Sequence, residues 1–140
     1  MEYRKFNDTI IVRFNRNEEI IEQLMNLVKK ENIKLGMVNA LGATNKFTVG
    51  VYSVEEKKYY SKEYTGAYEI VSLHGNISTM NGEPYLHLHM SCAGEDGVAV
   101  GGHLNSCVIS ATCEMFITLI DGGVDRVKDP ETGLNIYKFN

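Results

Sequence analysis

A stretch of alternating side chains, from Cys107 to Leu119, restricts the fold more than any other part of the sequence. Its odd-numbered residues are apolar or small, and its even-numbered ones include Ser110, Thr112 and Glu114. Side chains of a β-strand point in turn to opposite faces, so the pattern predicts a strand with one apolar and one polar face. We expect this strand to cover residues 106–120.

Strands are expected over most of the remaining chain, and only one segment has helical spacing. Apolar residues recur from Ile20 to Val28 at the spacing of an amphipathic helix. This helix is predicted to begin after Asn17, as its N-cap, and to end near Glu31. The other predicted strands are Thr9–Phe14, Ile33–Leu41, Phe47–Val54, Lys57–Tyr64 near a sheet edge, Glu69–Thr79 and Leu134–Phe139.

Length, charge and hydropathy limit the classes of function. The 140 residues, 44% of them hydrophobic, are expected to form one domain over 1–140 with its own core. The net charge of −4 argues against a general nucleic-acid surface, which needs a basic patch. No apolar run has the length of a membrane span and no signal peptide is recognisable, so we expect a cytoplasmic protein without a membrane partner.

Three of the four histidines fall within residues 84–104 and form the candidate metal site. His87 and His89 lie two apart in an apolar run, so a strand there would project both imidazoles from one face. His103 follows Gly101-Gly102, whose glycines permit a close backbone approach. Three imidazoles suit Zn, with Fe, Ni, Co or Cu as alternatives. The competing interpretation is a pair of hydrogen-bonded imidazoles on a half-exposed strand.

The remaining reactive side chains have weaker assignments. Cys92 falls on the face opposite His87 and is expected to pack as a small hydrophobe, while Cys107 and Cys113 are expected in the core or in an interface. Glu114 lies on the polar face of its strand, where it is either an acid/base group or an ordinary solvated glutamate. His74 is interpreted as a packing or hydrogen-bonding residue.

Several sequence motifs together, and the order in which they occur, resemble the PPC domain, the "plants and prokaryotes conserved" domain. In prokaryotes this domain is described as a predicted DNA-binding protein with a PD1-like motif. The resemblance covers nearly the whole chain. The matching segments are Asn39-Ala40-Leu41-Gly42-Ala43, residues 68–78, Gly82-Glu83-Pro84, His87-Leu88-His89, Gly101-Gly102-His103-Leu104 and Thr112-Cys113-Glu114.

The resemblance implies a compact α/β domain of the α+β type, with a mostly antiparallel sheet and one main helix, assembled as a homotrimer. It also implies a metal site, with zinc as the expected ion, at His87, His89 and His103. His74 is an alternative fourth ligand, because the family more often has a small polar residue there. Plant relatives carry a basic Arg-Gly-Arg-Pro arm that enters the DNA minor groove, and this chain has no such arm.

Three functions follow as hypotheses. The first is a non-catalytic, metal-binding trimer that acts in regulation or in interactions with other proteins. The second is a metal-dependent hydrolase or lyase in which zinc activates water and Glu114 is the general base. The third is direct DNA binding, against which the acidic charge balance and the missing basic arm both count.

Overall fold

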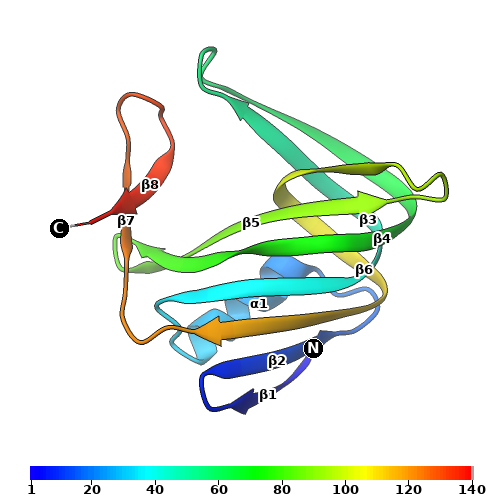
Figure 1. Ribbon diagram of the computed structural model, residues 1–140, viewed down its shortest axis with the longest axis horizontal. Helices are drawn as coiled ribbons and strands as arrows, with labels where there is room; N and C mark the ends of the chain where they lie inside the picture. The colour runs from blue at the N-terminus through cyan, green and yellow to red at the C-terminus, as the bar shows by residue number, and fades with distance from the viewer. Residues whose placement is uncertain (140) are drawn as a thin grey trace.

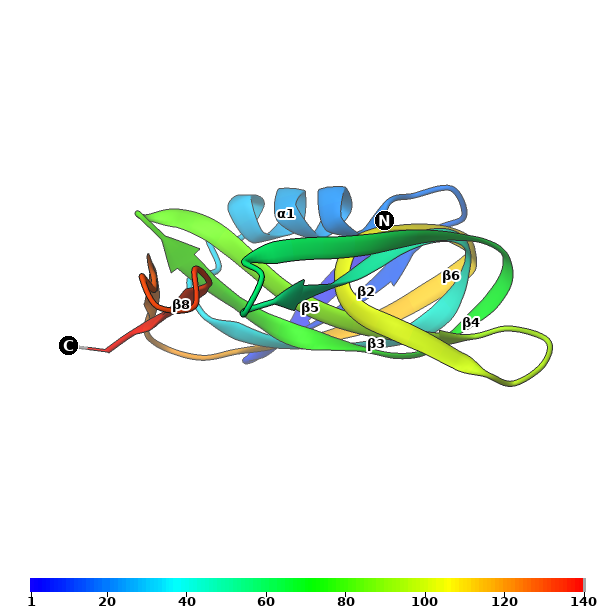
Figure 2. The same cartoon turned by 90° about the horizontal axis from the view of Figure 1, so that it is seen from above.

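A mostly antiparallel sheet of eight strands makes up most of the structure, and one helix covers one of its faces (Figures 1 and 2). The computed structural model describes residues 1–139. The elements, in chain order, are β1 (Glu2–Phe6), β2 (Thr9–Phe14), α1 (Ile20–Lys30), β3 (Gly36–Ser53), β4 (Lys58–Met80), β5 (Glu83–Ala93), β6 (Ala99–Leu119), β7 (Asp125–Lys128) and β8 (Asn135–Lys138). The expected single-domain α+β fold with one main helix is confirmed.

The strands pair in the order β1-β2-β6-β3-β4-β7-β8, and β5 pairs with both β4 and β6. The pairings β3–β4, β4–β5, β5–β6 and β6–β3 therefore close a circuit of four strands. Strand β3 pairs with β6 as far as Gly50, and past this point β3 and β4 continue together to their turn, at the top of Figure 1. Within residues 1–139, only the β4–β7 pairing is parallel.

Figure 2 shows helix α1 lying along one face of the sheet, and the apolar stripe of the helix packs against that face. Ile20, Leu24, Leu27 and Val28 are buried and meet apolar residues from β2, β3, β5 and β6 in one continuous core. Burial of such side chains stabilises the fold by about 1.5–3 kcal/mol each. None of the helices among residues 1–139 is long and apolar enough to cross a membrane.

The helix begins later than the sequence predicts, and its cap is a different residue. Asn17 has a positive φ of 70° and its N–H donates to Ile109 O of β6, so it belongs to the turn before the helix. The N-cap is Glu19, whose carboxylate accepts from Glu22 N at 2.7 Å and from Cys107 N at 2.8 Å. The prediction of Asn17 as the cap was wrong because tertiary bonds to β6 fix this turn.

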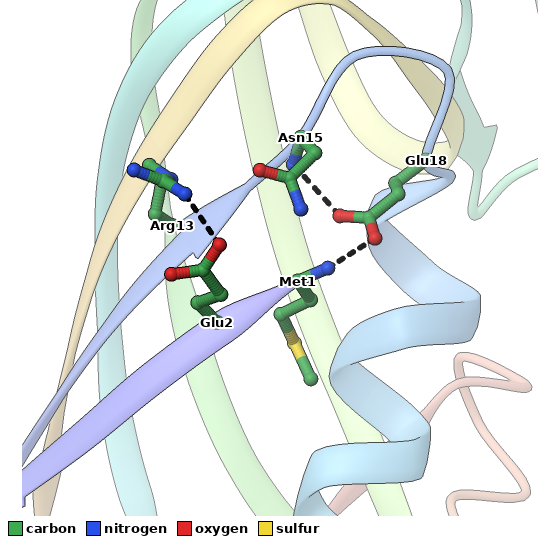
Figure 3. A network of polar contacts seen from close by, with 5 residues as sticks. All are labelled: Met1, Glu2, Arg13, Asn15 and Glu18. Atoms are coloured by element: carbon green, nitrogen blue, oxygen red, sulfur yellow. Dashed lines mark hydrogen bonds and ion pairs between the residues drawn. The ribbon is translucent and has the colours of Figure 1, made fainter.

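The same turn is tied to the start of the chain. Glu18 accepts a hydrogen bond from Asn15 N at 2.7 Å and pairs with the α-amino group of Met1, as Figure 3 shows. Beside it, Arg13 of β2 donates to Glu2 of β1 at 2.6 Å, across an exposed strand pair. Strand β1, which was not predicted from the sequence, pairs with β2 through its backbone. The ion pair between the α-amino group of Met1, just before β1, and Glu18 connects this strand to the turn before the helix.

Several predicted strands are shorter than the real ones. The segments predicted at 33–41 and 47–54 are one strand, β3, interrupted by irregular register, and those at 57–64 and 69–79 are one strand, β4. Bulges interrupt the alternation of apolar and polar side chains inside these strands, so each strand looks in the sequence like two separate strands. Strand β7 was also missed, whereas β8 agrees with the predicted last strand.

Candidate metal centre

Strand β5 presents its histidines on the face opposite the core, as its alternation predicts. Leu88 and Met90 are buried under the helix side, while His87 is half-buried and His89 is exposed on the other side. Across the β4–β5 pair, His87 lies opposite Asn76 and His89 opposite His74. The β5 strand therefore delivers two imidazoles to one surface.

The third imidazole reaches this surface because of a bulge in β6. Thr48 of β3 pairs with Ser106 of β6, but the next residue, Val49, pairs with Leu104, which leaves Asn105 as an extra residue. The bulge reverses the parity of the strand: Leu104 and Cys107 both point into the core, and His103 points away from it. A regular strand would have aimed His103 to the same side as Cys107.

His87, His89 and His103 lie together in the folded chain. One nitrogen from each ring can be chosen so that all three lie within 4.8 Å of one another. Their ring centroids are 5.2 Å (His87–His89), 5.3 Å (His87–His103) and 5.6 Å (His89–His103) apart. Tetrahedral zinc with bonds of about 2.0–2.1 Å sets its ligand nitrogens roughly 3.3 Å apart, a spacing reached by small ring rotations.

Two glycines bring the strands of the site close together. A Cβ at Gly75 of β4 would collide with the carbonyl oxygen of His87 and would lie 2.8 Å from the Cα of Leu88. A Cβ at Gly102 of β6 would lie 2.5 Å from the carbonyl oxygen of Gly50 in β3. Gly102 therefore permits the close approach that the sequence predicts. Gly102 lies inside strand β6 and not in a turn, because the chain reverses earlier, at residues 94–98.

The surroundings of His87 and His103 favour the neutral imidazole, which is the form that binds metal. Burial, the positive charge of Arg126, and His103 and His89 lower the pKa of His87 to about 4. Burial and His89 also lower the pKa of His103. Metal ligation requires neutral imidazoles, and no proton has to leave His87 at neutral pH. The three nitrogen donors fit zinc and the neighbouring divalent transition metals.

The cysteines do not take part in this centre. Cys92, Cys107 and Cys113 are free and buried in the core. Burial is the main cause that raises their pKa values, to about 12 for Cys92, about 11 for Cys107 and about 12 for Cys113. The prediction that Cys92 packs as a small hydrophobe is confirmed, and of the two alternatives for Cys107 and Cys113, core or interface, the structure shows the core.

Two other candidate residues lie outside the three-histidine group. His74 is exposed, and its ring centroid is 6.4 Å from that of His89, with a 3.4 Å contact between Nδ1 and Ser72 Oγ. Glu114 is exposed and lies between Arg13 and Leu41 in the sheet. It is eleven residues along β6 from His103, roughly 36 Å at the usual strand rise, so the chain does not bring Glu114 to its own histidines.

Sequence reasoning missed Arg126, on β7, which packs beside the site. Its side chain is only 5% exposed, and its guanidinium lies between the rings of Tyr85 and Tyr137, 4.7 and 4.3 Å from their centroids. Nη2 donates to Asn76 Oδ1 at 2.8 Å, and Asn76 is the cross-strand neighbour of His87. The segment around Arg126 has no periodicity that would have indicated a buried charge.

Comparison with protein families gives one match. The model of the Plants and Prokaryotes Conserved (PCC) domain matches residues 1–121, which include the three histidines and end before Arg126. No match to a curated protein was found.

Solved structures with this fold cover almost the entire chain. A candidate DNA-binding protein from Bacteroides thetaiotaomicron is 34% identical with a TM-score of 0.96, over 99% of this chain and 96% of its own. A metal-containing protein from Archaeoglobus fulgidus is 30% identical with a TM-score of 0.88, over 99% and 96%. A plant- and prokaryote-conserved (PPC) protein from Pyrococcus horikoshii is 29% identical with a TM-score of 0.85, over 99% and 94%.

Proposed function

The chain belongs to the Plants and Prokaryotes Conserved domain family, and we propose that it is a homotrimeric module that binds a divalent transition metal, zinc in the first place, at His87, His89 and His103. Its role is regulatory or in protein interaction, without catalysis. The observation that carries the metal assignment is the convergence of three imidazole nitrogens within 4.8 Å. A relative at 30% identity is described as metal-containing, which supports the same assignment.

Metal analysis of the purified protein tests this site. We expect one metal ion per chain in the parent protein and a loss of nearly all of it in His87→Ala/His89→Ala. His74→Ala is the matched control, because it removes an exposed imidazole that lies beside the cluster but outside it. Equal metal content in the double variant and the parent would refute the assignment.

An exposed apolar patch supports the trimer. Ile11, Met37, Leu41 and Phe116 are between 38% and 59% exposed and surround Asn39 on the sheet face away from α1. Contiguous exposed apolar surface of this kind is typical of an interface. A second and a third copy of this chain are the proposed occupants, in keeping with the assembly that the family resemblance implies.

Light scattering coupled to size exclusion tests the assembly. We expect a mass of three chains for the parent protein and a monomer for Leu41→Glu/Phe116→Glu, because each glutamate would place a charge within the proposed interface. Val54→Glu is the control, since Val54 is also exposed but lies at the turn of the β3–β4 arm. A monomeric parent protein would refute the trimer.

The alternative functions have less support. A hydrolase or lyase would need a general base near the metal, and Glu114 of the same chain lies at the far end of β6. Direct DNA binding would need positive charge, and the chain carries a net charge of −4. A mobility-shift assay at physiological salt that gave tight duplex binding would reverse this ranking.

A further inference from the structure

We propose that the metal at the three-histidine centre takes a small carboxylate as its remaining ligand, and that Arg126 selects this anion over neutral ligands. The inference rests on the proposed metal site and adds to it the chemical class of the ligand. It follows from a buried cation, Arg126, that has no acidic partner among residues 1–139.

Arg126 is buried, and all its partners are neutral. Its Nε donates to Ser78 Oγ at 2.8 Å, its Nη1 to the carbonyl oxygen of Asn135 at 2.7 Å and its Nη2 to Asn76 Oδ1 at 2.8 Å. No carboxylate within residues 1–139 forms an ion pair with it. The preceding Asp125 is exposed and accepts from the hydroxyl of Thr79 instead.

An uncompensated buried charge is expensive, so it requires an explanation. Isolation of a cation from water costs several kcal/mol unless an opposite charge or a full set of hydrogen bonds offsets it. Arg126 makes three hydrogen bonds through its five N–H groups and stacks on Tyr85 and Tyr137. These contacts hold the guanidinium rigidly but leave its positive charge unbalanced.

The metal adds to this imbalance. The three-histidine group contains no aspartate or glutamate, so a divalent ion bound by neutral imidazoles keeps its full charge of +2. With Arg126 close by, the loaded centre has a local charge of +3, and no carboxylate described within residues 1–139 forms an ion pair with Arg126. The ligand that best completes such a centre is an anion with oxygen donors.

The connection between Arg126 and the centre is short and direct. Asn76 accepts from Nη2 and is the cross-strand neighbour of His87, one of the three ligands. Cross-strand neighbours have Cβ atoms about 5 Å apart, so the guanidinium bound to Asn76 lies on the order of 8 Å from the side chain of His87.

Carboxylate is favoured over bulkier anions by the surroundings of the guanidinium. The rings of Tyr85 and Tyr137 lie 4.7 and 4.3 Å from the guanidinium carbon, and its three hydrogen bonds use three of its five N–H groups, so two N–H groups at its edge remain for an incoming group. A planar group with two oxygens can coordinate the metal with one oxygen and direct the other toward a guanidinium edge. Phosphate serves as the comparison anion in the test.

The test uses cobalt(II)-loaded full-length protein, whose visible absorption reports each change in the metal's ligands. Acetate and acetamide are titrated separately, because they have the same shape and differ in charge. The variants are Arg126→Gln, Arg126→Lys and the control Lys128→Gln, which removes an exposed charge from the same strand. Cobalt content and circular dichroism are measured for each variant, so that loss of metal or of fold is detected separately.

Unit charges roughly 8 Å apart at an effective dielectric constant of about 20 change an affinity on the order of 30-fold. We therefore expect acetate to bind Arg126→Gln about 30-fold more weakly than the parent, with acetamide changed less than about twofold. Arg126→Lys keeps most of the preference, and Lys128→Gln keeps all of it. Phosphate binding tighter than acetate would overturn the choice of carboxylate.

The possible failures are distinguishable. Parent protein that binds no cobalt through its histidines would refute both this inference and the proposed metal site. Cobalt bound normally, with equal acetate affinities in the parent protein and in a folded Arg126→Gln, would overturn the role of Arg126 and leave the metal site standing. If Arg126→Gln does not fold, the ratio of acetate to acetamide affinity in Arg126→Lys decides, and a ratio near one overturns the inference.

Discussion

Substitution of Gly75 by alanine tests whether the close approach of β4 and β5 holds the histidine strand in place. The new Cβ would collide with the carbonyl oxygen of His87 and lie 2.8 Å from the Cα of Leu88, whereas ordinary contacts begin at 3.4 Å. Both atoms belong to the backbone of β5, which cannot rotate away as a side chain can. The strand must therefore move by more than about half an ångström where it carries His87.

The expected cost is a balance of two terms. Forcing an extra methyl group into a packed region costs about 1–3 kcal/mol, and a backbone collision lies at the upper end of this range. Replacing glycine by alanine in a strand returns roughly 0.5–1 kcal/mol because the unfolded chain becomes less flexible. The net loss of unfolding free energy is about 2 kcal/mol, or about 1 M in the urea midpoint for a typical slope of ~2 kcal/mol/M.

Urea unfolding at one fixed protein concentration measures this loss, since the stability of an oligomer depends on concentration. Gly123→Ala is the matched control, because its Cβ would meet only the Cβ of Lys34, at 4.0 Å. Zinc competition with a chelator should in addition show an affinity lowered by about 10-fold or more, as for other perturbations that displace a ligand's support. A Gly75→Ala midpoint equal to that of Gly123→Ala would show that β5 does not depend on this approach.

Three further predictions concern the helix, the thiols and the histidines. Glu19→Ala should lower the unfolding free energy by about 1–2 kcal/mol, because it removes both the N-cap and the hydrogen bond to Cys107 N. Glu55→Ala is the control and should leave the unfolding free energy unchanged. Equal urea midpoints for the two variants would contradict this prediction. The raised pKa values of Cys92, Cys107 and Cys113 predict no reaction of the native protein with a thiol reagent and reaction of all three in urea; rapid labelling of the native protein would contradict their burial. His87, whose pKa is lowered to about 4, should stay neutral in the metal-free protein in an NMR titration until the pH falls well below 6. Because the unfolded chain binds more protons between about pH 6.5 and 4, the metal-free protein should lose stability as the pH falls through that interval; a stability that rises there would refute the assignment.

The sequence predicted those parts of the site that follow from regular alternation. His87 and His89 on one face of β5, with Cys92 on the other, came directly from period-two parity and agree with the structure. His103 was included because of the glycines before it. The feature that turns its ring outward, the bulge at Asn105, has no signal in a single sequence, since an extra residue changes parity without changing composition.

What the sequence could not predict depends on contacts between distant segments. Arg126 lies 39 residues after His87 and reaches the site through a parallel β4–β7 contact that no local pattern indicates. Glu114 lies on the polar face of its strand, as predicted, but alternation predicts only the face of a side chain and not how far along the strand it lies from the histidines. The observed N-cap is Glu19 and not the predicted Asn17, because backbone hydrogen bonds to Ile109 fix the turn and outweigh the local capping preference of asparagine.

The hairpin formed by β5 and β6 also bears on the order of events in folding. His87, His89 and His103 all lie on this hairpin, and His89 pairs directly with His103. The three imidazoles therefore meet through contacts between residues that are close in the sequence, and such contacts form early and at a low entropic cost. Zinc can bind this hairpin before β6 has met β3, so we expect added zinc to speed refolding as well as to slow unfolding. An unchanged refolding rate in stopped-flow measurements would contradict this order.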